Sequence, residues 1–272
     1  MNIIVFDTET LGMKSQDLLN VGYRVLDLNP ITGEVKMLCE RDMIDLNLFS
    51  AVSKLYAYKG CLEEDMEIIL TNNFLSRAKY EKYVNAINLK KIERHSIRKI
   101  FEIMSQDLAK YQVICGYAYN SNFDTDKFNK TAIKFGLVNP IEKLPIFDIW
   151  AYAVNHICRT EEYIQWAKDN QIFTASESYI STSVESVVKF LTNNLEFVED
   201  HTALSDTQWE TAILLECLRR KCDITRAEQR GSNIESGKVF NKTIVLPTGE
   251  RLEFEYTKTV TKTANEYYYE KK

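Results

Sequence analysis

An apolar segment at the start of the chain carries two acidic residues, and it constrains the fold more than any other segment. Residues 3–6 are Ile, Ile, Val and Phe without a polar interruption, which is typical of a strand buried on both faces. Asp7 and Glu9 follow two positions apart, so a strand directs both carboxylates to the same face. Two such carboxylates repel each other and lose solvation, and a bound cation relieves both effects. The pair alone is weak evidence, because many strand ends carry acidic residues for capping or solubility.

The composition narrows the class of protein. The chain has 272 residues, of which 45% are hydrophobic, enough for one large domain or two modest ones. It shows neither a hydrophobic run of membrane-spanning length nor a signal peptide, so we expect a cytoplasmic protein with no membrane partner. The six cysteines lack CxxC spacing, which indicates reduced thiols and neither a zinc site nor a disulfide framework. With a net charge of -5, any phosphate-binding surface must be local.

The first half of the chain alternates between strand and helix patterns. Residues 18–28 and 34–44 alternate apolar and polar side chains around a turn-forming loop, which predicts a hairpin continuing the first strand. Residues 46–95 are mostly helical and charged, and we interpret them as an inserted arm. Ser96 is a candidate N-cap for a helix with an apolar stripe from Ile97 to Tyr111. Basic side chains near its start either contact phosphates or form an ordinary solvated face; they are Lys90, Lys91, Arg94, Arg98 and Lys99.

The next segments bring more acidic residues to the ends of strands. Residues 113–119 predict a strand that leads into a helix carrying Asp124 in its first turn, where a carboxylate is often only a cap. Residues 144–147 predict another short strand, and Asp148 is interpreted as the N-cap of a helix over residues 149–158 and not as a metal ligand. We expect residues 159–182 to be irregular, followed by a helix capped by Ser183.

The last third contains a histidine and an acidic residue at the start of a helix. His201 stands five residues before Asp206. Alone, such a histidine is more often an ordinary hydrogen-bonded residue than a functional one. Residues 238–246 and 251–260 predict a hairpin around a turn. The tyrosines at 267–269 either stack on single-stranded bases or belong to a simple tail.

Three segments taken together resemble one enzyme family. They are FDTETLG at residues 6–12, YNSNFD at residues 119–124 and HTALSD at residues 201–206, and in order and residue type they resemble the motifs of the DEDDh exonucleases. The resemblance implies an α/β, ribonuclease H-like fold over residues 1–225, with a mixed five-stranded sheet flanked by helices. The helical insertion at about 46–95 and a C-terminal β-hairpin extension and tail at 226–272 would be additions to it.

The resemblance also implies a site and a reaction. It makes Asp7, Glu9, Asp124 and Asp206 ligands of two Mg²⁺ or Mn²⁺ ions, with His201 as general base. Residues expected to contact the terminal nucleotide are Thr8, Thr10, Leu11, Gly12, Asn120 and Phe123. The implied activity is a 3′–5′ exonuclease that releases nucleoside 5′-monophosphates from a nucleic acid with a free 3′ end, with single-stranded DNA favoured. A polymerase or another replication protein is an implied partner.

Two rival functions stay open from the sequence. One is an exoribonuclease or short-oligonucleotide exonuclease of the same family. The other is a binding module that keeps the fold without catalysis. Two departures from the family pattern bear on them: the span from Glu9 to Asp124 is longer than in compact members, and Leu11 stands where many members have threonine or a smaller residue.

Overall fold

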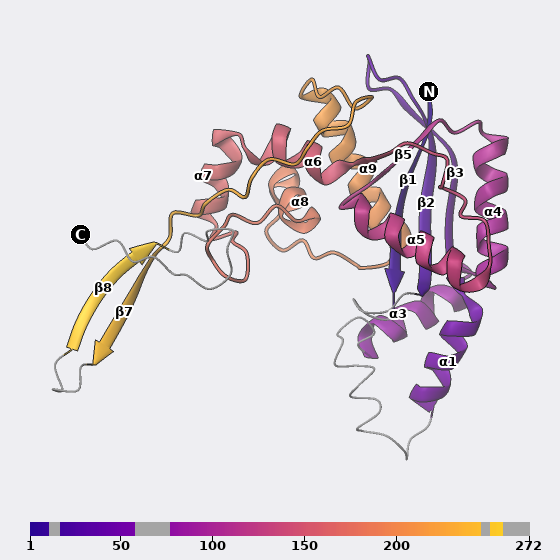
Figure 1. The fold of residues 1–272 in the computed structure, drawn as a ribbon, viewed down its shortest axis with the longest axis horizontal. Helices are drawn as coiled ribbons and strands as arrows, with labels where there is room; N and C mark the ends of the chain where they lie inside the picture. The colour runs from indigo at the N-terminus through magenta and orange to yellow at the C-terminus, as the bar shows by residue number, and fades with distance from the viewer. Residues whose placement is uncertain (11–16, 58–76, 246–250, 258–272) are drawn as a thin grey trace.

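A mixed sheet flanked by helices forms the centre of this α/β protein (Figure 1). The computed structural model describes residues 1–10, 17–57, 77–245 and 251–257. The sheet order is β4-β3-β2-β1-β5-β6, in which β1, β2 and β3 are antiparallel neighbours and the other pairings are parallel. Its strands are β1 (Asn2–Thr10), β2 (Leu18–Leu28), β3 (Val35–Asp45), β4 (Glu93–His95), β5 (Cys115–Ala118) and β6 (Ile146–Asp148).

The central strand β1 is buried on both faces, as its continuous apolar run predicted. Ile3 and Val5 belong to a core shared with α6 (Ile149–Ala153) and α9 (Ala203–Arg219). The alternate residues Ile4 and Phe6 belong to a core on the other face, shared with helices α4 (Ile97–Lys110) and α5 (Ser121–Phe135). Asp7 and Glu9 therefore continue the row of side chains that faces α9, whereas Thr8 continues the row that faces α5.

Several helix starts follow the predicted caps. The Ser96 hydroxyl accepts a hydrogen bond from the Lys99 backbone N–H at the start of α4. Asp148 accepts from the Trp150 N–H at 2.9 Å, which confirms its role as the N-cap of α6. Ser183 caps α8 (Val184–Thr192) through the Ser186 N–H. Each cap satisfies a backbone donor that a helix cannot satisfy internally.

Two expectations about secondary structure were wrong, and one predicted helix differs in type along its length. The sheet has six strands instead of five, because the short charged segment Glu93–His95 adds a parallel edge strand to β3. Residues 159–182 are not wholly irregular, since they contain α7 (Glu161–Asp169), which starts at the Thr160 cap. The helix predicted over residues 149–158 is confirmed in its extent, but it changes from α6 into the π-helix η1 (Val154–Cys158), where the Arg159 N–H donates to the Val154 carbonyl.

The inserted arm lies at the end of the sheet to which β1 leads (Figure 1). It comprises α1 (Leu46–Ala57) and α3 (Arg77–Asn88), and it contacts the sheet through a small core of its own. The Phe49 and Tyr80 rings stack at 5.6 Å between centroids, joining the two helices. The described part of the insertion thus contains two helices, as expected, but its final residues form the strand β4.

The C-terminal residues form the expected hairpin. Strand β7 (Val239–Val245) pairs with β8 (Arg251–Thr257) as a separate two-stranded sheet, which lies beyond α7 and apart from the main sheet (Figure 1). The predictions for Leu11, Gly12 and the tyrosines at 267–269 lie outside the described residues. In the described ranges, no helix combines the length and the apolar character needed to cross a bilayer.

Candidate active site

Three segments that are far apart in the sequence bring their acidic residues together at the carboxyl end of β1. Asp124, in the first turn of α5, accepts hydrogen bonds from the Thr8 N–H at 3.0 Å and from the Thr8 hydroxyl at 2.7 Å. Ligand atoms of Glu9, His201 and Asp206 all lie within 4.8 Å of one another. The structure therefore assembles the four predicted carboxylates and the predicted histidine around one site.

A glycine allows α9 to reach this site. Gly22 in β2 lies opposite Asp7 in the strand pairing. A Cβ atom at this position would overlap the backbone of Ala203 and Leu204, the first residues of α9. The start of α9 thus rests directly on the backbone of β2, and this close approach brings Asp206 next to β1.

Asn20 in β2 also stabilises the contact between β2 and the start of α9. Its Oδ1 accepts hydrogen bonds from the Ala203 N–H at 3.0 Å and from the Tyr83 hydroxyl of α3 at 3.1 Å. Its Nδ2 donates to Asp42 Oδ1 at 2.6 Å. Asn20 is fully buried and pairs with Glu9 across the strands. One amide therefore connects β2, the start of α9 and the inserted arm.

The environment of the cluster opposes ionisation. Burial raises the pKa of Asp124 to about 7, and burial together with Glu199 and Glu9 raises the pKa of Asp206 to about 9. Burial, and next the charge of Asp124, raises the pKa of Asp7 well above its ordinary value, although its side chain is not completely shielded from solvent. Packing several carboxyls into one buried space is costly unless positive charge joins them.

Two oxygens of the cluster lack a hydrogen-bond partner. They are Oδ1 of Asp206 and Oε2 of Glu210, both buried on α9. Buried polar atoms nearly always have a partner, so these two oxygens are available to a ligand. Carboxylate oxygens are hard ligands that suit Mg²⁺ or Mn²⁺. The donor set therefore fits the cations that the sequence implied.

Glu210 is a member of the cluster that the sequence analysis missed. It follows Asp206 by four residues on α9, so both carboxyls lie on the same side of the helix. Burial, and next the charge of Asp124, raises the pKa of Glu210 well above its ordinary value. An acidic residue one helical turn after Asp206, on the side that packs against the sheet, was the available signal.

A lysine of the inserted arm reaches the cluster. Lys79 Nζ on α3 forms an ion pair with Glu9 Oε1 at 2.8 Å, and both side chains are nearly buried. This pair opposes the effect of burial on Glu9, whose pKa is nevertheless raised. Lys79 therefore supplies part of the positive charge that the carboxylates need.

His201 lies at the exposed edge of the cluster. Its backbone adopts a left-handed conformation with φ of 52°, immediately before the Thr202 N-cap of α9. Partial burial, and next the charge of Lys79, lowers the pKa of its imidazole. The ring is therefore largely neutral at pH 7 and can accept a proton or bind a metal ion through nitrogen.

The predicted nucleotide-contacting residues differ in availability. Thr8 and Thr10 are buried, and the Thr8 hydroxyl is committed to Asp124. Phe123 is half-buried. Asn120 is exposed, and its N–H donates to Asp148 Oδ1 at 2.9 Å. A pocket of about 410 Å³ adjoins this loop, and it is lined in part by Asn120, Asn122, Phe147, Trp150 and Arg230.

Comparison with known proteins finds no family model that matches this chain and no curated protein that matches it. The function is therefore inferred from the chemistry of the site.

Proposed function

We propose that the protein is a metal-dependent 3′–5′ exonuclease with a ribonuclease H-like fold. One observation carries this proposal: Asp7, Asp124 and Asp206 come from three distant segments to one buried cluster with unpartnered carboxylate oxygens. The order and residue types of these segments resemble the DEDDh motifs. A mixed sheet with helices on both faces and acidic residues at the end of its central strand is compatible with that fold.

The carboxylates would hold the cations that the reaction needs. Asp7, Glu9, Asp124 and Asp206 would bind two Mg²⁺ or Mn²⁺ ions, with the Glu210 carboxyl next to them. Such ions activate water and stabilise negative charge on the leaving oxygen of a phosphodiester. Thr8 fixes the Asp124 carboxylate through two hydrogen bonds to its Oδ1.

His201 would act as the general base. Its lowered pKa keeps the imidazole neutral near pH 7, which is the form that accepts a proton from water. Its exposed place beside Glu9 and Asp206 leaves room for a substrate. The products would be nucleoside 5′-monophosphates, and single-stranded DNA is the favoured substrate. A polymerase or replication protein as partner rests on the motif resemblance alone.

A digestion experiment tests the activity. End-labelled single-stranded and duplex DNA and RNA of several lengths are incubated with the protein in Mg²⁺ and in EDTA. We expect Mg²⁺-dependent shortening from the 3′ end, which a bulky phosphorothioate-linked 3′ terminus stops and a blocked 5′ end does not. Fragments released from a circular single strand would indicate an endonuclease instead. Degradation of RNA alone would favour the exoribonuclease alternative.

Matched variants connect this activity to the cluster. Asp124→Asn should lose cleavage, whereas Asp126→Asn should retain it, because Asp126 only pairs with Lys130 on the exposed side of the same helix. Near-normal, Mg²⁺-dependent cleavage by the Asp124 variant would refute the assignment. Asp7→Ala should likewise abolish turnover while the protein stays folded.

A further variant separates the base from the metal ligands. His201→Ala should cleave about 10² to 10⁴-fold more slowly yet bind Mn²⁺ almost as the wild type does. His95→Ala is the control, since the His95 ring pairs with Glu93 of the edge strand β4 and is not a member of the carboxylate cluster. If His201→Ala loses Mn²⁺ binding as strongly as Asp206→Asn does, His201 is a ligand and not the base.

A further inference from the structure

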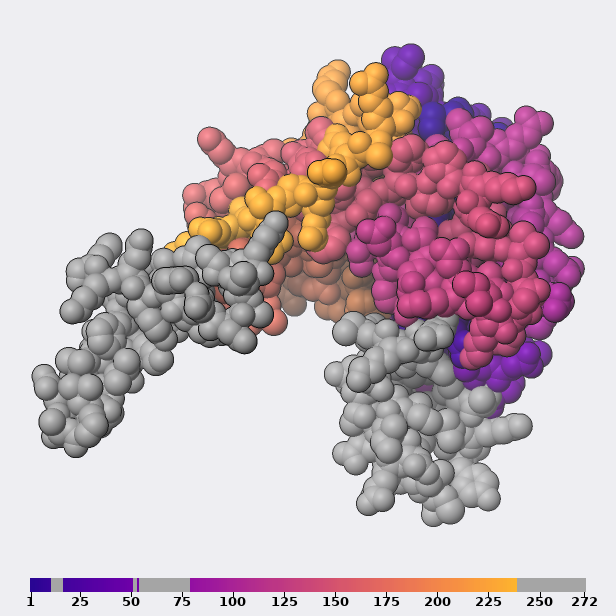
Figure 2. Space-filling model, in the orientation of Figure 1, coloured from indigo at the N-terminus to yellow at the C-terminus, as the bar shows by residue number. Residues whose placement is uncertain are grey.

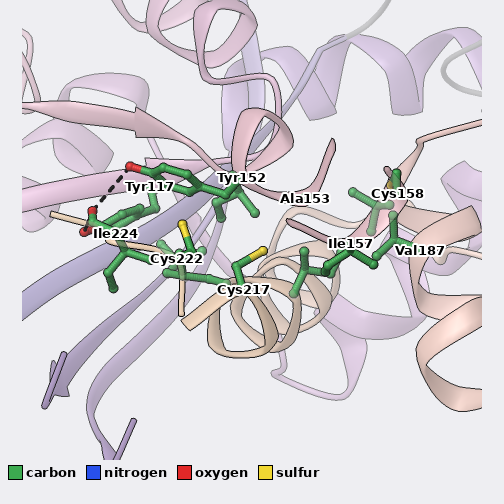
Figure 3. Packing of buried hydrophobic residues seen from close by; sticks show 14 of the residues in the cluster. Tyr117, Tyr152, Ala153, Ile157, Cys158, Val187, Cys217, Cys222 and Ile224 are labelled. Atoms are coloured by element: carbon green, nitrogen blue, oxygen red, sulfur yellow. Dashed lines mark hydrogen bonds between the residues drawn. The ribbon is translucent and has the colours of Figure 1, made fainter. Parts of the chain in front are cut away.

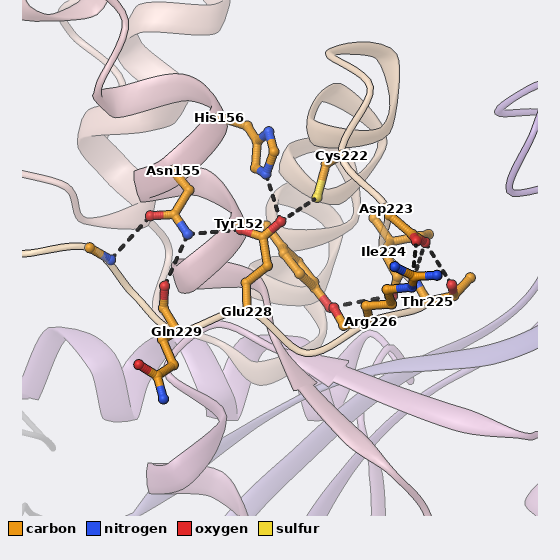
Figure 4. A network of polar contacts seen from close by, with 11 residues as sticks. Tyr152, Asn155, His156, Cys222, Asp223, Ile224, Thr225, Arg226, Glu228 and Gln229 are labelled. Atoms are coloured by element: carbon orange, nitrogen blue, oxygen red, sulfur yellow. Dashed lines mark hydrogen bonds and ion pairs between the residues drawn. The ribbon is translucent and has the colours of Figure 1, made fainter.

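A second group of metal-ligating side chains lies away from the carboxylate cluster and takes no part in the proposed reaction. It comprises His156 on η1, Cys222 just after α9, and Glu228 in the segment that follows (Figure 4). One ligand atom from each lies within 4.8 Å of the others. His156 Nε2 lies 2.8 Å from Glu228 Oε1, and the Cys222 thiol lies 3.8 Å from the same oxygen.

Rigid surroundings hold these three residues. Cys222 is buried in the core with Cys217, Tyr117 and Tyr152 (Figure 3). The Tyr117 hydroxyl donates to the Ile224 carbonyl at 2.9 Å and so fixes the chain just after Cys222. The Tyr152 hydroxyl donates to the Arg226 carbonyl at 2.8 Å, just before Glu228. The three potential ligands are therefore positioned by the core and do not depend on free loops.

A local irregularity of the helix carries the histidine. η1 is a π-helix, a rare conformation that is frequent at functional sites. It carries both His156 and its neighbour Asn155 to the segment at 223–231. Asn155 Nδ2 donates to Glu228 Oε2 at 2.8 Å, and Asn155 Oδ1 accepts from the Gly231 N–H at 3.1 Å. Asn155 thus orients the carboxylate, so that Oε1 remains directed to His156 and Cys222.

We propose that His156, Cys222 and Glu228 form a binding site for a divalent transition-metal ion of the Zn²⁺ type, with water as the fourth ligand. Thiolate, imidazole and carboxylate are the ligands that Zn²⁺ takes in proteins. The hydrogen bond from Asn155 to the free carboxylate oxygen is the kind of outer contact that fixes a ligand at metal sites. His156 and Glu228 are each about a quarter exposed, which leaves an entry path.

The two separations to Glu228 Oε1 need only a small adjustment, and the third pair of ligand atoms lies within 4.8 Å. Tetrahedral zinc with ordinary bond lengths separates its ligand atoms by about 3.3 to 3.6 Å. The Cys222–Glu228 separation of 3.8 Å is close to this range, whereas the His156–Glu228 separation of 2.8 Å must open by roughly 0.5 Å. A rotation of the His156 ring, whose side chain is partly exposed, supplies this movement.

The CxxC criterion could not find this site, since one cysteine is combined here with a histidine and a glutamate from other segments.

The consequence of metal binding is structural. It would fasten the segment at 223–231 to η1, and Figure 2 shows that segment as an orange band on the protein surface. The same segment carries Arg230, whose guanidinium lies 3.7 Å from the centre of the Trp150 ring beside the pocket at Asn120.

The test is a titration of the metal-free, full-length protein with Co²⁺ and Zn²⁺. Co²⁺ bound by a thiolate gives a near-ultraviolet charge-transfer band, which carboxylate ligands alone do not give, so occupation of the active site does not interfere. With excess Mg²⁺ present to occupy the carboxylate cluster, we expect this band to saturate with Co²⁺ and Zn²⁺ to displace it. Cys222→Ser should abolish the band. Cys39→Ser is the control and should retain the band, because Cys39 is a half-exposed cysteine that lies beside Asp107.

Variants of the other ligands complete the test. His156→Ala and Glu228→Gln should each weaken Co²⁺ binding roughly tenfold or more. Both side chains are partly exposed, so these variants keep the test valid should Cys222→Ser fail to fold. Absence of the band in the wild type, its persistence in Cys222→Ser, or unchanged affinity in both other variants would overturn the proposal. Loss of exonuclease activity has no bearing on this result.

Discussion

Replacing Asp206 with asparagine is expected to stabilise the metal-free protein and to remove its response to metal. Asp206 is buried, its Oδ1 has no hydrogen-bond partner, and burial together with the neighbouring carboxyls raises its pKa. Asparagine has nearly the same shape and carries no charge. The substitution therefore removes an electrostatic cost and leaves the packing of α9 on β2 unchanged.

The magnitude follows from the pKa. In the native protein the pKa of Asp206 is about 9 against an ordinary value of 3.8, so at pH 7 the folded state retains a proton that the unfolded state has lost. Each unit costs about 1.4 kcal/mol, which gives roughly 4 kcal/mol at pH 7 for an isolated group. Because the carboxyls of the cluster interact, removing one of them recovers only part of this free energy. The buried asparagine N–H₂ also loses solvation, which costs about 1–3 kcal/mol. We expect a net gain of about 1 to 2 kcal/mol.

The sign with pH is specific. Because the folded pKa is raised, the stability that Asp206 contributes is fully present below about pH 4 and is lost as the pH rises toward about 9. At pH 4 the electrostatic gain is absent and only the cost of burying the asparagine N–H₂ remains, so Asp206→Asn should melt at or below the wild type there. At pH 7 to 8 the variant should melt roughly 2–8 °C higher.

Thermal denaturation followed by circular dichroism, in EDTA and across this pH range, measures the difference. Mn²⁺ should then raise the melting temperature of the wild type but not of Asp206→Asn. Asp200→Asn is the control, because Asp200 is exposed on the loop before α9 and forms only an exposed ion pair with Lys82; it should change stability by less than about 0.5 kcal/mol. If Asp206→Asn melts below the wild type by the same amount at pH 4 and pH 8, the electrostatic reasoning is wrong.

Two further predictions concern α9 and β2. Glu210→Gln should also stabilise the metal-free protein above pH 5 and should weaken Mn²⁺ binding; unchanged Mn²⁺ affinity would make Glu210 a buried neighbour and not a ligand. Gly22→Ala should destabilise the protein by about 3 kcal/mol in urea denaturation and separate the cluster, because its Cβ overlaps backbone atoms of α9. Gly136→Ala is the control, since it has open space and only a positive φ, and it should cost about 1 kcal/mol; equal losses would contradict the close contact at Gly22.

The elements that the sequence predicted well have strong local signals. The run at Ile3–Phe6 is typical of a strand covered on both faces, and the caps Ser96, Asp148 and Ser183 act within three residues of themselves. Two acidic positions on one strand face, together with acidic residues at two helix starts, identified residues that the fold brings together. Short-range rules suffice for such features.

The missed features depend on contacts between distant segments. β4 becomes a strand only because β3 presents a free edge to it. Asn20 reads as an ordinary polar residue in a strand, and its role depends on Ala203 and Tyr83, which are far away along the chain. The π-helix η1 was not predicted, because a short apolar segment has no sequence pattern that distinguishes a π-helix from an α-helix.

The arm formed by α3 touches the carboxylate cluster in two ways, through the Lys79–Glu9 ion pair and through the Tyr83–Asn20 hydrogen bond. Asn20 in turn holds the first residue of α9. A divalent ion that draws Glu9 away from Lys79 therefore removes an ion pair that holds α3 against the sheet. Conversely, a partner that displaces α3 makes Glu9 more available to the ion. Because thermodynamic coupling is reciprocal, these two effects are equal in size. Docking of α3 on the sheet and binding of the ion therefore each weaken the other.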